Sequence, residues 1–334
     1  LVMNANKEII YRSPQWEEDR AIIEFDQREK KFRSQNFVNN DLTDFENIYM
    51  ATVTGLRDYV IKNRFPGVIL GLSGGIDSAF CAAVAVDALG EDKVEGFMLP
   101  SIYTSQNSFD DAEECAKRLN ISLENISIEK TYLSLEESLK KTFKDASPDI
   151  TEENLQSRIR GTILMAISNK KGKMLITTGN KSEVSVGYST LYGDMNGGFN
   201  PIKDIYKTEL FSLAKWRNKN LPKNVCLKKL DIIPDSIIEK EPTAELKDNQ
   251  KDTDSLPSYD KLDQILEGLV EYELSTNELE KKGFSREEIK KIENLLYISE
   301  YKRRQSAPGV KISLRNFGRD RRYPITNKFR DKIE

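Results

Sequence analysis

The segment SGGIDS, residues 73–78, combines two glycines, two hydroxyl groups and one carboxylate between an apolar run and an alanine-rich stretch. Glycines let the backbone approach a ligand closely, and the unpaired N–H groups of a helix start attract anions. Asp77 alone would repel a phosphate, which favours a bridging magnesium ion; the plainer alternative is a turn with an acidic helix start. The segment has neither the lysine of a Walker A loop nor the spacing of a dinucleotide motif. It therefore predicts a phosphate site of another kind.

A glycine-rich stretch after residue 178 holds further candidates. Glu183 and Asp194 are carboxylates suited to metal or proton chemistry, although turn formation alone would also explain them. Lys207 lies near a predicted helix start, where the helix dipole disfavours a cation, and this conflict indicates a functional reason. The chain contains no histidine, which excludes Ser-His-Asp and Cys-His catalysis and His-ligated zinc within it. Its own proton transfers must use carboxylates, lysine, tyrosine or water.

Three basic residues deserve separate interpretations. Arg158 and Arg160 precede the apolar sequence GTILMAI, and this setting favours contact with a substrate over exposure to solvent. Lys302 ends a predicted helix, where cations are normal, so its position alone favours a solvated helix end.

Alternating elements must position these residues. Short apolar runs typical of strands buried on both faces lie at 68–72, 94–99, 123–128 and 174–178, and helical patterns lie between them at 76–89, 107–119 and 152–169. This order predicts an α/β fold, a doubly wound, Rossmann-like parallel sheet with helices on both faces and a helical C-terminal extension. Such sheets bind ligands at the carboxyl ends of their strands, and SGGIDS directly follows the first strand.

The segments that flank this core are less regular. Residues 1–26 contain predicted strands around a turn at 4–6 and at 21–25, and they indicate either the tail of a preceding domain or an edge hairpin. Residues 27–44 suit a linker, and residues 45–334 form the main domain, with amphipathic helices from 45 to before 65, at 259–273 and at 286–302. Within the long, charged, proline-punctuated stretch 218–257, the segment EKEPTAELKDNQKDTDSLP (239–257) is predicted to be a mobile lid or ordering loop over the site.

The composition excludes several classes of protein. Lys and Arg total 51 against 54 Asp and Glu, a net charge of -3, so the chain has no overall attraction to nucleic acid or anionic membrane. Cys81, Cys115 and Cys226 are widely spaced, which disfavours disulfides and zinc and favours the cytoplasm. No apolar run approaches about 18 residues, so we expect neither a membrane span nor a secretory leader.

SGGIDS resembles the SGGxDS loop of the ATP pyrophosphatases, which holds the β- and γ-phosphates while ATP is cleaved between its α- and β-phosphates. Synthetases for NAD, GMP, asparagine and argininosuccinate share this loop, so it indicates a reaction class. Other segments are similar to NAD synthetases, above all to the synthetase half of the glutamine-dependent form. These segments are LITTGNKSEVSVGYSTLYGDMNGGFNPIKDIYKTEL (175–210), SRIRG (157–161), EPTAEL (241–246), DSLPSYDKLDQILEGLVE (254–271) and EYKRRQSAPGVKISLRNFGRDRRYPITNKFR (300–330). In that form a nitrilase-like amidase makes ammonia from glutamine, and residues 1–26 are similar to its end.

The resemblance implies ATP-dependent amidation of nicotinate adenine dinucleotide (deamido-NAD) to NAD through an adenylate, the last step of NAD biosynthesis. It implies ATP and Mg²⁺, ammonia or glutamine, an amidase domain in cis and a homodimer of synthetase domains. The implied ATP contacts are Gly71, Leu72, Ser73, Gly74, Gly75, Ile76, Asp77, Ser78, Thr178, Lys207 and Thr243. The implied deamido-NAD contacts are Arg158, Glu183, Tyr188, Leu191 and Lys302. Asp77 and Glu183 are the implied metal ligands, and Asp194 and Lys207 the implied catalytic residues, with Asp194 at the ammonia.

One departure and two alternatives qualify this expectation. Gly198 stands where ammonia-dependent relatives usually have an acidic residue, so that contact is not carried over. Glu183 remains open between the metal and deamido-NAD. A tRNA-modifying pyrophosphatase is the first alternative, given the basic sequence GRDRRYPITNKFR, but the scattered cysteines count against it. A noncatalytic nucleotide sensor is the second, and the acidic pair Asp77 and Glu183 argues against it.

Overall fold

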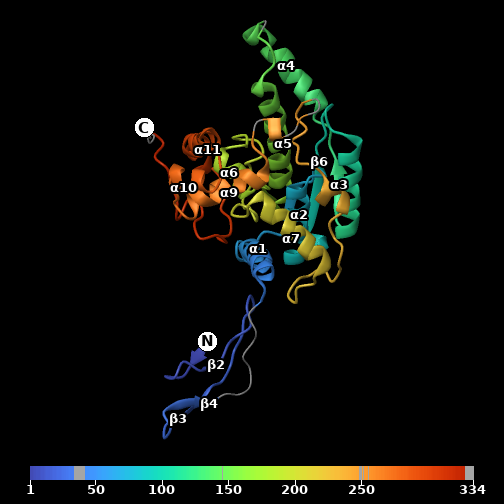
Figure 1. Ribbon diagram of the computed structural model, residues 1–334. Helices are drawn as coiled ribbons and strands as arrows, with labels where there is room; N and C mark the ends of the chain where they lie inside the picture. Colours follow the sequence, from blue (N-terminus) through green and yellow to red (C-terminus); the bar gives the residue numbers. More distant parts are fainter. Residues whose placement is uncertain (34–41, 145, 248–249, 251, 255, 328–334) are drawn as a thin grey trace.

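The computed structural model describes residues 1–33, 42–144, 146–247, 250, 252–254 and 256–327. Within them, the centre of the fold is a parallel sheet with the strand order β7-β6-β5-β8 (Figure 1). These strands span Ser122–Asn125, Val94–Met98, Val68–Gly71 and Met174–Ile176. Val68 lies beside Val94 on one side and beside Met174 on the other. The predicted doubly wound parallel sheet is confirmed.

Alternate side chains of β5 point to opposite faces of the sheet. Val68 and Leu70 share one apolar core with α1 (Asp44–Lys62), α2 (Ile76–Leu89), α3 (Gln106–Leu119) and α7 (Lys207–Lys219). Ile69 packs on the other face with α5 (Ile150–Lys171) and the start of α4 (Glu129–Phe143). Helices therefore cover both faces, because an uninterrupted apolar strand needs burial on each side.

The strand order creates a crevice at the carboxyl end of β5. The chain enters the sheet at β5, adds β6 and then β7 on one side, and returns to the other side with β8. The segments that leave β5 and β8 therefore diverge, and doubly wound sheets bind ligands at such a point. The two segments meet across it, because Asn180 after β8 donates through Nδ2 to Asp77 Oδ1 at 2.8 Å.

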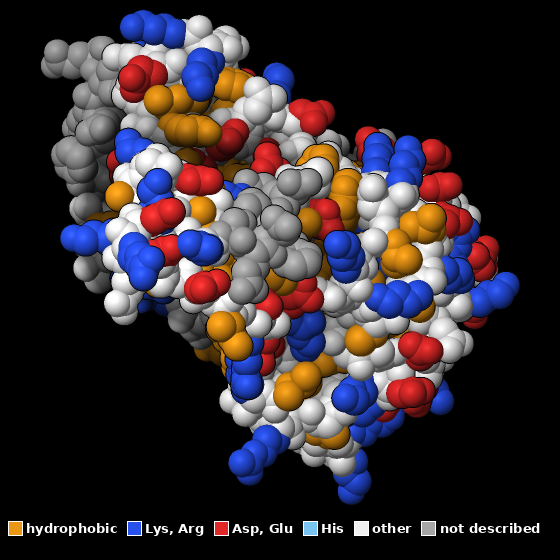
Figure 2. All heavy atoms as spheres, turned by 90° about the horizontal axis from the view of Figure 1, so that it is seen from below, with side chains coloured by type: hydrophobic (Ala, Val, Ile, Leu, Met, Phe, Trp, Pro, Cys, Tyr) orange, Lys and Arg blue, Asp and Glu red, His pale blue; other side chains and the backbone are white. Residues whose placement is uncertain are grey.

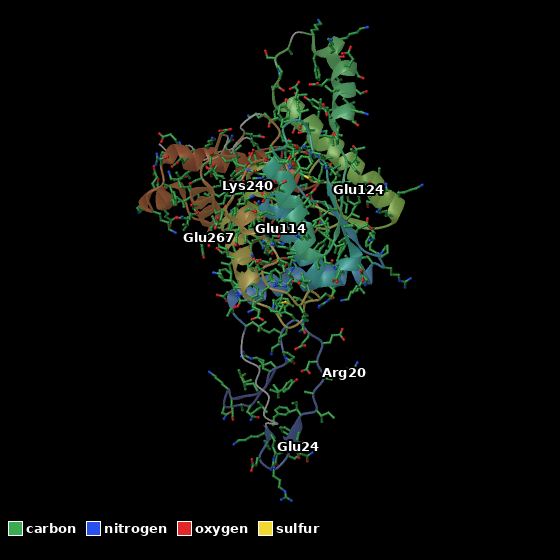
Figure 3. The ribbon with its side chains drawn as sticks, turned by 90° about the vertical axis from the view of Figure 1, so that its right-hand side faces the viewer. Arg20, Glu24, Glu114, Glu124, Lys240 and Glu267 are labelled. Atoms are coloured by element: carbon green, nitrogen blue, oxygen red, sulfur yellow. The ribbon has the colours of Figure 1, made fainter. Side chains whose placement is uncertain are left out.

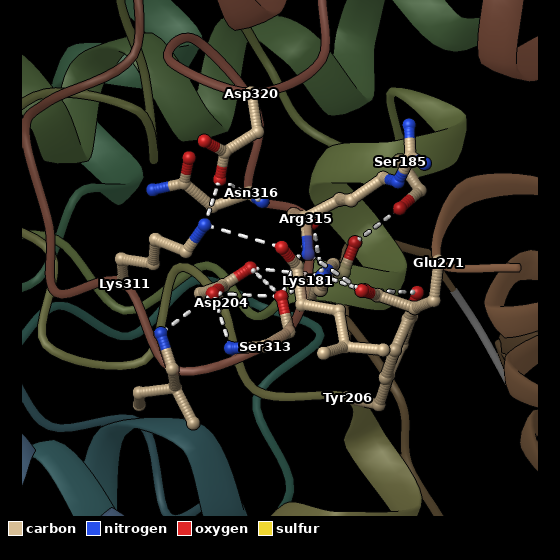
Figure 4. Close-up of polar contacts among 12 residues, drawn as sticks. Lys181, Ser185, Asp204, Tyr206, Glu271, Lys311, Ser313, Arg315, Asn316 and Asp320 are labelled. Atoms are coloured by element: carbon tan, nitrogen blue, oxygen red, sulfur yellow. Dashed lines mark hydrogen bonds and ion pairs between the residues drawn. The ribbon is translucent and has the colours of Figure 1, made fainter.

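A second apolar core lies beside the sheet. It is built by α6 (Lys181–Val186), α9 (Tyr259–Val270), α10 (Thr276–Lys281) and α11 (Arg286–Ile298), with α12 (Glu300–Arg303) following. A buried polar cluster around Lys181 fastens it to the sheet domain (Figure 4). Lys181 Nζ lies 2.9 Å from Asp204 Oδ1, pairs with Glu271 and donates to Ser313 Oγ at 2.5 Å. These partners compensate a fully buried ammonium for its lost hydration.

Two small hairpins precede the main domain. β1 (Val2–Met3) pairs with β2 (Ile9–Tyr11), and β3 (Glu24–Asp26) pairs with β4 (Lys31–Arg33), both antiparallel. They extend away from the sheet in Figure 1, and Arg20 and Glu24 lie far from the body of the molecule in Figure 3. The strand predicted at 21–25 begins only at Glu24, and β4 lies inside the predicted linker. Residues 34–41 of that linker lie outside the described residues.

Other elements also differ from the sequence-based expectation. β7 is an edge strand with Ser122 and Glu124 exposed, so it is not buried on both faces. The helix predicted at 286–302 is interrupted at Ser299. The segment 239–257 predicted as a lid begins at the last residue of helix α8 (Asp235–Glu239) and contains a 3₁₀ turn at Asp252–Asp254, while positions 248, 249, 251 and 255 lie outside the described residues. Among the described helices, none is long and apolar enough to cross a membrane.

Candidate active site

A cavity of about 350 Å³ opens at the carboxyl ends of β5, β6 and β8. Its lining comes from the SGGIDS turn, the ends of β6 and β8, helix α5, the loop after α6, the segment 240–246 and the region around α12. The cavity thus lies where the strand order places a ligand site. Thr178, Tyr188 and Thr243 are three of the predicted site residues that line it.

The SGGIDS turn leaves the start of α2 open toward the cavity. Gly75 is the N-cap and no side chain caps the helix. The first helical bond joins Ala79 N to Gly75 O, so the N–H groups of residues 76–78 precede it. The serine hydroxyls brace the turn, since Ser78 Oγ donates to Gly75 O at 3.0 Å and lies 3.1 Å from Ser73 Oγ. The start of this 14-residue helix, with the N–H groups of residues 76–78 uncapped by any described side chain, is therefore a suitable anion site.

Gly74 contributes shape to the turn and does not line the cavity, unlike the other predicted residues of 71–78. Its φ of +77° lies in the left-handed region, and an added Cβ would collide with Ser108 O. Gly74 is therefore required for the turn to pass close to α3.

Lys207 joins the two predicted metal ligands. Its Nζ pairs with Asp77 Oδ2 and lies 3.5 Å from Glu183 Oε1, and its side chain is only 3% exposed. Burial alone would lower the pKa of Lys207, but the charges of Asp77 and Glu183 outweigh it and raise that pKa. Burial and then the charge of Asp77 raise the pKa of Glu183 to about 8. Near neutral pH the cluster therefore holds one ammonium between the Asp77 carboxylate and a Glu183 carboxyl whose ionisation burial and Asp77 disfavour.

Asp252 and Tyr259 extend this cluster, and neither was among the residues predicted from the sequence. Tyr259 donates through OH to Asp252 Oδ2 at 2.8 Å, and Tyr188 donates to Asp252 Oδ1 at 3.3 Å. The Lys207 ammonium lies 5.3 Å from the centre of the Tyr259 ring. Asp252 also lines the cavity. For Tyr259 the only available signal was the similarity of the segment DSLPSYD (254–260) to the family, and Asp252 lies outside that segment.

The donor set suits a hard divalent cation. Asp77 and Glu183 both reach the cavity, and their side chains keep 19% and 18% of their surface exposed. Among the described residues there is no cluster of three or more His, Cys, Asp or Glu side chains arranged to hold a metal. Magnesium is commonly held by one or two carboxylates together with substrate phosphates, so two carboxylates beside an anion site fit it.

Asp194 lies in the loop after α6, packed against α5. Its Oδ1 accepts from Thr190 N at 2.8 Å, and its N–H donates to Ser157 Oγ at 3.0 Å. Gly193 has no room for a side chain, because an added Cβ would collide with Ser157. Asp194 lines the cavity, and its surface is exposed to the solvent there. Nearby protein atoms still displace part of the water around its carboxyl, and this desolvation raises its pKa to about 6. A carboxylate with such a pKa is a suitable proton acceptor near neutral pH.

Of the basic residues considered in the sequence, Lys302 and Arg160 line the cavity and Arg158 does not. Lys302 lines the cavity and donates through Nζ to Gly187 O at 2.7 Å and Ser189 O at 2.6 Å. Arg160 also lines it, with Nε donating to Leu99 O at 2.8 Å. The implied substrate residues Arg158 and Leu191 do not line it; Arg158 Nε donates to Leu191 O at 3.2 Å, so the two contact each other instead.

The segment 240–246 is fastened over the cavity by one carboxylate. Glu245 Oε1 accepts from Ser105 Oγ and Ser108 Oγ, each at 2.8 Å, at the start of α3. Lys240, labelled within the body of the molecule in Figure 3, donates to Ser108 Oγ at 2.6 Å. Thr243 lines the cavity, but its hydroxyl donates to Gln250 O at 2.6 Å. The described part of the predicted lid is thus held against α3.

Comparison with known proteins places the chain in a family. The family model described as NAD synthase matches residues 48–306. The chain belongs to the NAD synthase family. The match contains the sheet, the SGGIDS turn, the Lys207 cluster and the Asp194 loop.

Family members that resemble the chain are longer than it is. Glutamine-dependent NAD(+) synthetases of Rhodobacter capsulatus and Thermotoga maritima are 49% and 47% identical over 99% and 92% of the chain, which covers 60% and 52% of their lengths. The structure of glutamine-dependent NAD+ synthetase from Acinetobacter baumannii in complex with ADP is 45% identical over 97% of the chain and 57% of its own, with a TM-score of 0.67. An NH3-dependent NAD synthetase from Campylobacter jejuni, solved with a nitrate ion, is 28% identical over 76% of the chain and 94% of its own, with a TM-score of 0.58. The chain therefore spans little more than half of the glutamine-dependent relatives.

Proposed function

We propose that the chain is the synthetase part of a glutamine-dependent NAD synthetase. It uses ATP to amidate deamido-NAD to NAD and releases pyrophosphate and AMP, the last step of NAD biosynthesis. The observation that carries this proposal is Lys207, held by Asp77 and Glu183 beside the open start of α2, with Asp194 in the same cavity. The named activity of the similar relatives supports it.

In the first half-reaction, a carboxylate oxygen of deamido-NAD attacks the α-phosphorus of ATP. The bond from that phosphorus to the bridging oxygen of the β-phosphate breaks, and pyrophosphate leaves with the electron pair. Lys207 and the N–H groups at the start of α2 stabilise the charge that grows on pyrophosphate. The product is NAD-adenylate, in which the carboxyl group is activated as a mixed anhydride.

In the second half-reaction, ammonia attacks the activated carbonyl carbon and the carbon–oxygen bond to the phosphoryl group breaks. AMP leaves, and the nitrogen loses one proton as it becomes an amide. Asp194 accepts that proton, because its carboxylate faces the cavity and its pKa of about 6 leaves it ionised near neutral pH. This assignment needs no histidine, as the composition of the chain requires.

Magnesium, when bound, neutralises phosphate charge and orients the phosphates of ATP. Asp77 and Glu183 are the residues that would hold it, together with the phosphates. Before binding, Lys207 supplies the positive charge between these two carboxylates. We keep Glu183 as the residue that either holds the ion or contacts deamido-NAD.

The larger assembly is also a proposal. We infer that residues 1–26 are the tail of a nitrilase-like amidase domain, residues 27–44 a linker and residues 45–334 the synthetase domain, because the similar relatives extend well beyond this chain. The 89% exposure of Ile22 supports contact with a further domain. Exposed apolar side chains of α4 and the start of α5, such as Leu133 at 54% and Ile150 at 64%, support a homodimer. Three unpaired cysteines support the reducing cytoplasm.

The proposal is tested by supplying the purified chain with ATP, Mg²⁺, deamido-NAD and ammonium, then quantifying NAD, AMP and pyrophosphate by chromatography. We expect equimolar products, and we expect glutamine to fail in place of ammonium. Asp77→Asn should abolish turnover, whereas Asp110→Asn on the exposed face of α3 serves as the matched control. ATP binding without NAD formation by the native chain would replace the proposal with a nucleotide sensor.

The same assay separates two other candidates. Nicotinate mononucleotide is to be tested as an alternative substrate in this assay. The reason is that the solved NMN synthetase of Francisella tularensis is 26% identical over 78% of the chain, with a TM-score of 0.64. Faster amidation of that mononucleotide would change the substrate assignment. A tRNA-modifying role requires salt-dependent RNA binding, yet Figure 2 shows Lys and Arg mixed with Asp and Glu over one face, without a broad basic surface there.

A further inference from the structure

Arg160 presents a positive charge to the cavity with no anionic partner. It lies on α5, lines the cavity and is fixed through Nε, which donates to Leu99 O at the end of β6. For its two terminal nitrogens we find no acceptor among the described residues. Asp194 and Glu245 are the carboxylates whose charges act on it, but neither forms an ion pair with it.

Three buried cations of the described residues pair with carboxylates. Lys181 pairs with two carboxylates, Lys207 pairs with Asp77 and Glu183, and Arg217 pairs with Asp87. Arg160 is only partly buried, and the loss of hydration lowers its pKa to about 10, which still leaves the guanidinium charged at neutral pH. A partly buried charge without a counter-ion loses some hydration, so a ligand that supplies an anion would offset this cost.

The position of Arg160 indicates which anion that is. Leu164, one helical turn further along α5, lies against Gly71, the last residue of β5 before the SGGIDS turn; its Cδ1 is 3.4 Å from where a Cβ on Gly71 would be. Gly161, the residue after Arg160, lies against Gly193 in the loop that carries Asp194, since an added Cβ would be 2.7 Å from Gly193 O. Arg160 is therefore on the wall between the turn that would hold pyrophosphate and the loop that would receive ammonia.

We propose that Arg160 holds the α-phosphoryl group, the phosphate that ATP, the adenylate and AMP have in common. This inference rests on the proposed function. The pyrophosphate end already has Lys207 and the start of α2, whereas the reacting phosphorus must lie between that end and the acceptor. A guanidinium offers two parallel N–H donors that match two oxygens of one phosphate. Arg160 is thus assigned a contact that persists through both half-reactions.

The test compares Arg160→Ala and Arg160→Lys with Lys170→Ala, a control that removes an exposed cation near the end of the same helix. Calorimetric titration measures the affinities for AMP, ATP, adenosine and pyrophosphate. We expect Arg160→Ala to lose about 10- to 100-fold in affinity for AMP and ATP, since one charged hydrogen-bonded contact is removed. Adenosine and pyrophosphate should bind as in the native chain, Arg160→Lys should lose less, and Lys170→Ala should lose nothing.

Three results would overturn the assignment. They are unchanged AMP affinity in Arg160→Ala, an equal loss for adenosine, and an equal loss in Lys170→Ala. Thermal unfolding and adenosine binding check that the variant is folded, and Arg160→Lys carries the comparison if the alanine variant is not. The proposed function fails separately, because a native chain that binds AMP through Arg160 but forms no NAD would refute the ligase reaction and leave the phosphate contact in place.

Discussion

Replacing Asp194 with asparagine separates the two half-reactions. Asparagine keeps the oxygen that accepts from Thr190 N at 2.8 Å, so the loop should retain its shape. It cannot accept the proton of the attacking nitrogen. We therefore expect Asp194→Asn to form the adenylate and release pyrophosphate at nearly the native rate, while NAD formation falls by about 10²- to 10⁴-fold, the usual contribution of a general base.

The same substitution should also change the free energy of unfolding, and the sign of the change follows from the raised pKa of Asp194. Burial raises the pKa of Asp194 from 3.8 to about 6, so the folded chain binds this proton more tightly than the unfolded chain does. Ionisation therefore lowers the free energy of unfolding as the pH rises through this range, and the loss is complete above it. The full shift corresponds to about 3 kcal/mol, but solvent in the cavity reaches the carboxylate, so we expect about 1 kcal/mol.

The assay has a kinetic part and an equilibrium part. Single-turnover experiments measure pyrophosphate release without ammonia and NAD formation with it, at a fixed concentration of free ammonia across the pH series. The native amidation rate should rise with pH through about 6, and the variant should lose this rise. Urea unfolding should show Asp194→Asn more stable than the native chain at pH 8, by roughly 1 kcal/mol, and less so at pH 5.

Two outcomes would refute this reasoning. An equal loss of both half-reactions would mean that Asp194 organises the whole site and does not act as the base. A variant less stable than the native chain at pH 8 would contradict the sign of the pKa shift. Asp110→Asn, exposed on α3, controls for the general effect of removing one negative charge.

Three further substitutions test other parts of the structure. Lys207→Met leaves the Asp77 carboxylate beside Glu183 without its cation, so ATP titration should show no binding and urea unfolding a loss of about 3 kcal/mol. Gly74→Ala meets both a φ of +77° and the Ser108 carbonyl, so calorimetry should show weaker binding of ATP and pyrophosphate and a lower Tm, while an unchanged Tm would contradict the proposed close approach. Arg217→Met leaves Asp87 buried without its 2.7 Å partner, far from the cavity, so unfolding should show a loss of about 3–5 kcal/mol with KM for ATP unchanged in the folded fraction.

Most of the sheet could be predicted because its strands carry their own signal. VIL in β5 and MLI in β8 are uninterrupted apolar runs, and glycine or proline lies near their ends. The position of β7 in the chain was predicted correctly, but its predicted burial on both faces was wrong. An edge strand needs burial on fewer sides and therefore tolerates an exposed Glu124. The short helix α6 was missed because six residues give too little periodicity to recognise.

The site was predictable only in part. Periodicity shows that Arg158 and Arg160 cannot share one helix face, but it does not say which face meets the cavity. The structure selects Arg160. Asp252 had no local signal at all, because an aspartate in a polar loop is ordinary until tertiary contacts place it beside Tyr259 and Lys207.

The sequence by itself determined the fold class and the kind of chemistry. Glycines and a carboxylate directly after an apolar strand are a local arrangement, and the absence of histidine restricts proton transfer whatever the fold. The tertiary structure decided which charges meet. Lys207 and Asp77 are 130 residues apart, and only the return of the chain to the other side of β5 brings them together. Spacing along a chain cannot encode such a contact, because it depends on strand order and helix packing across the whole domain.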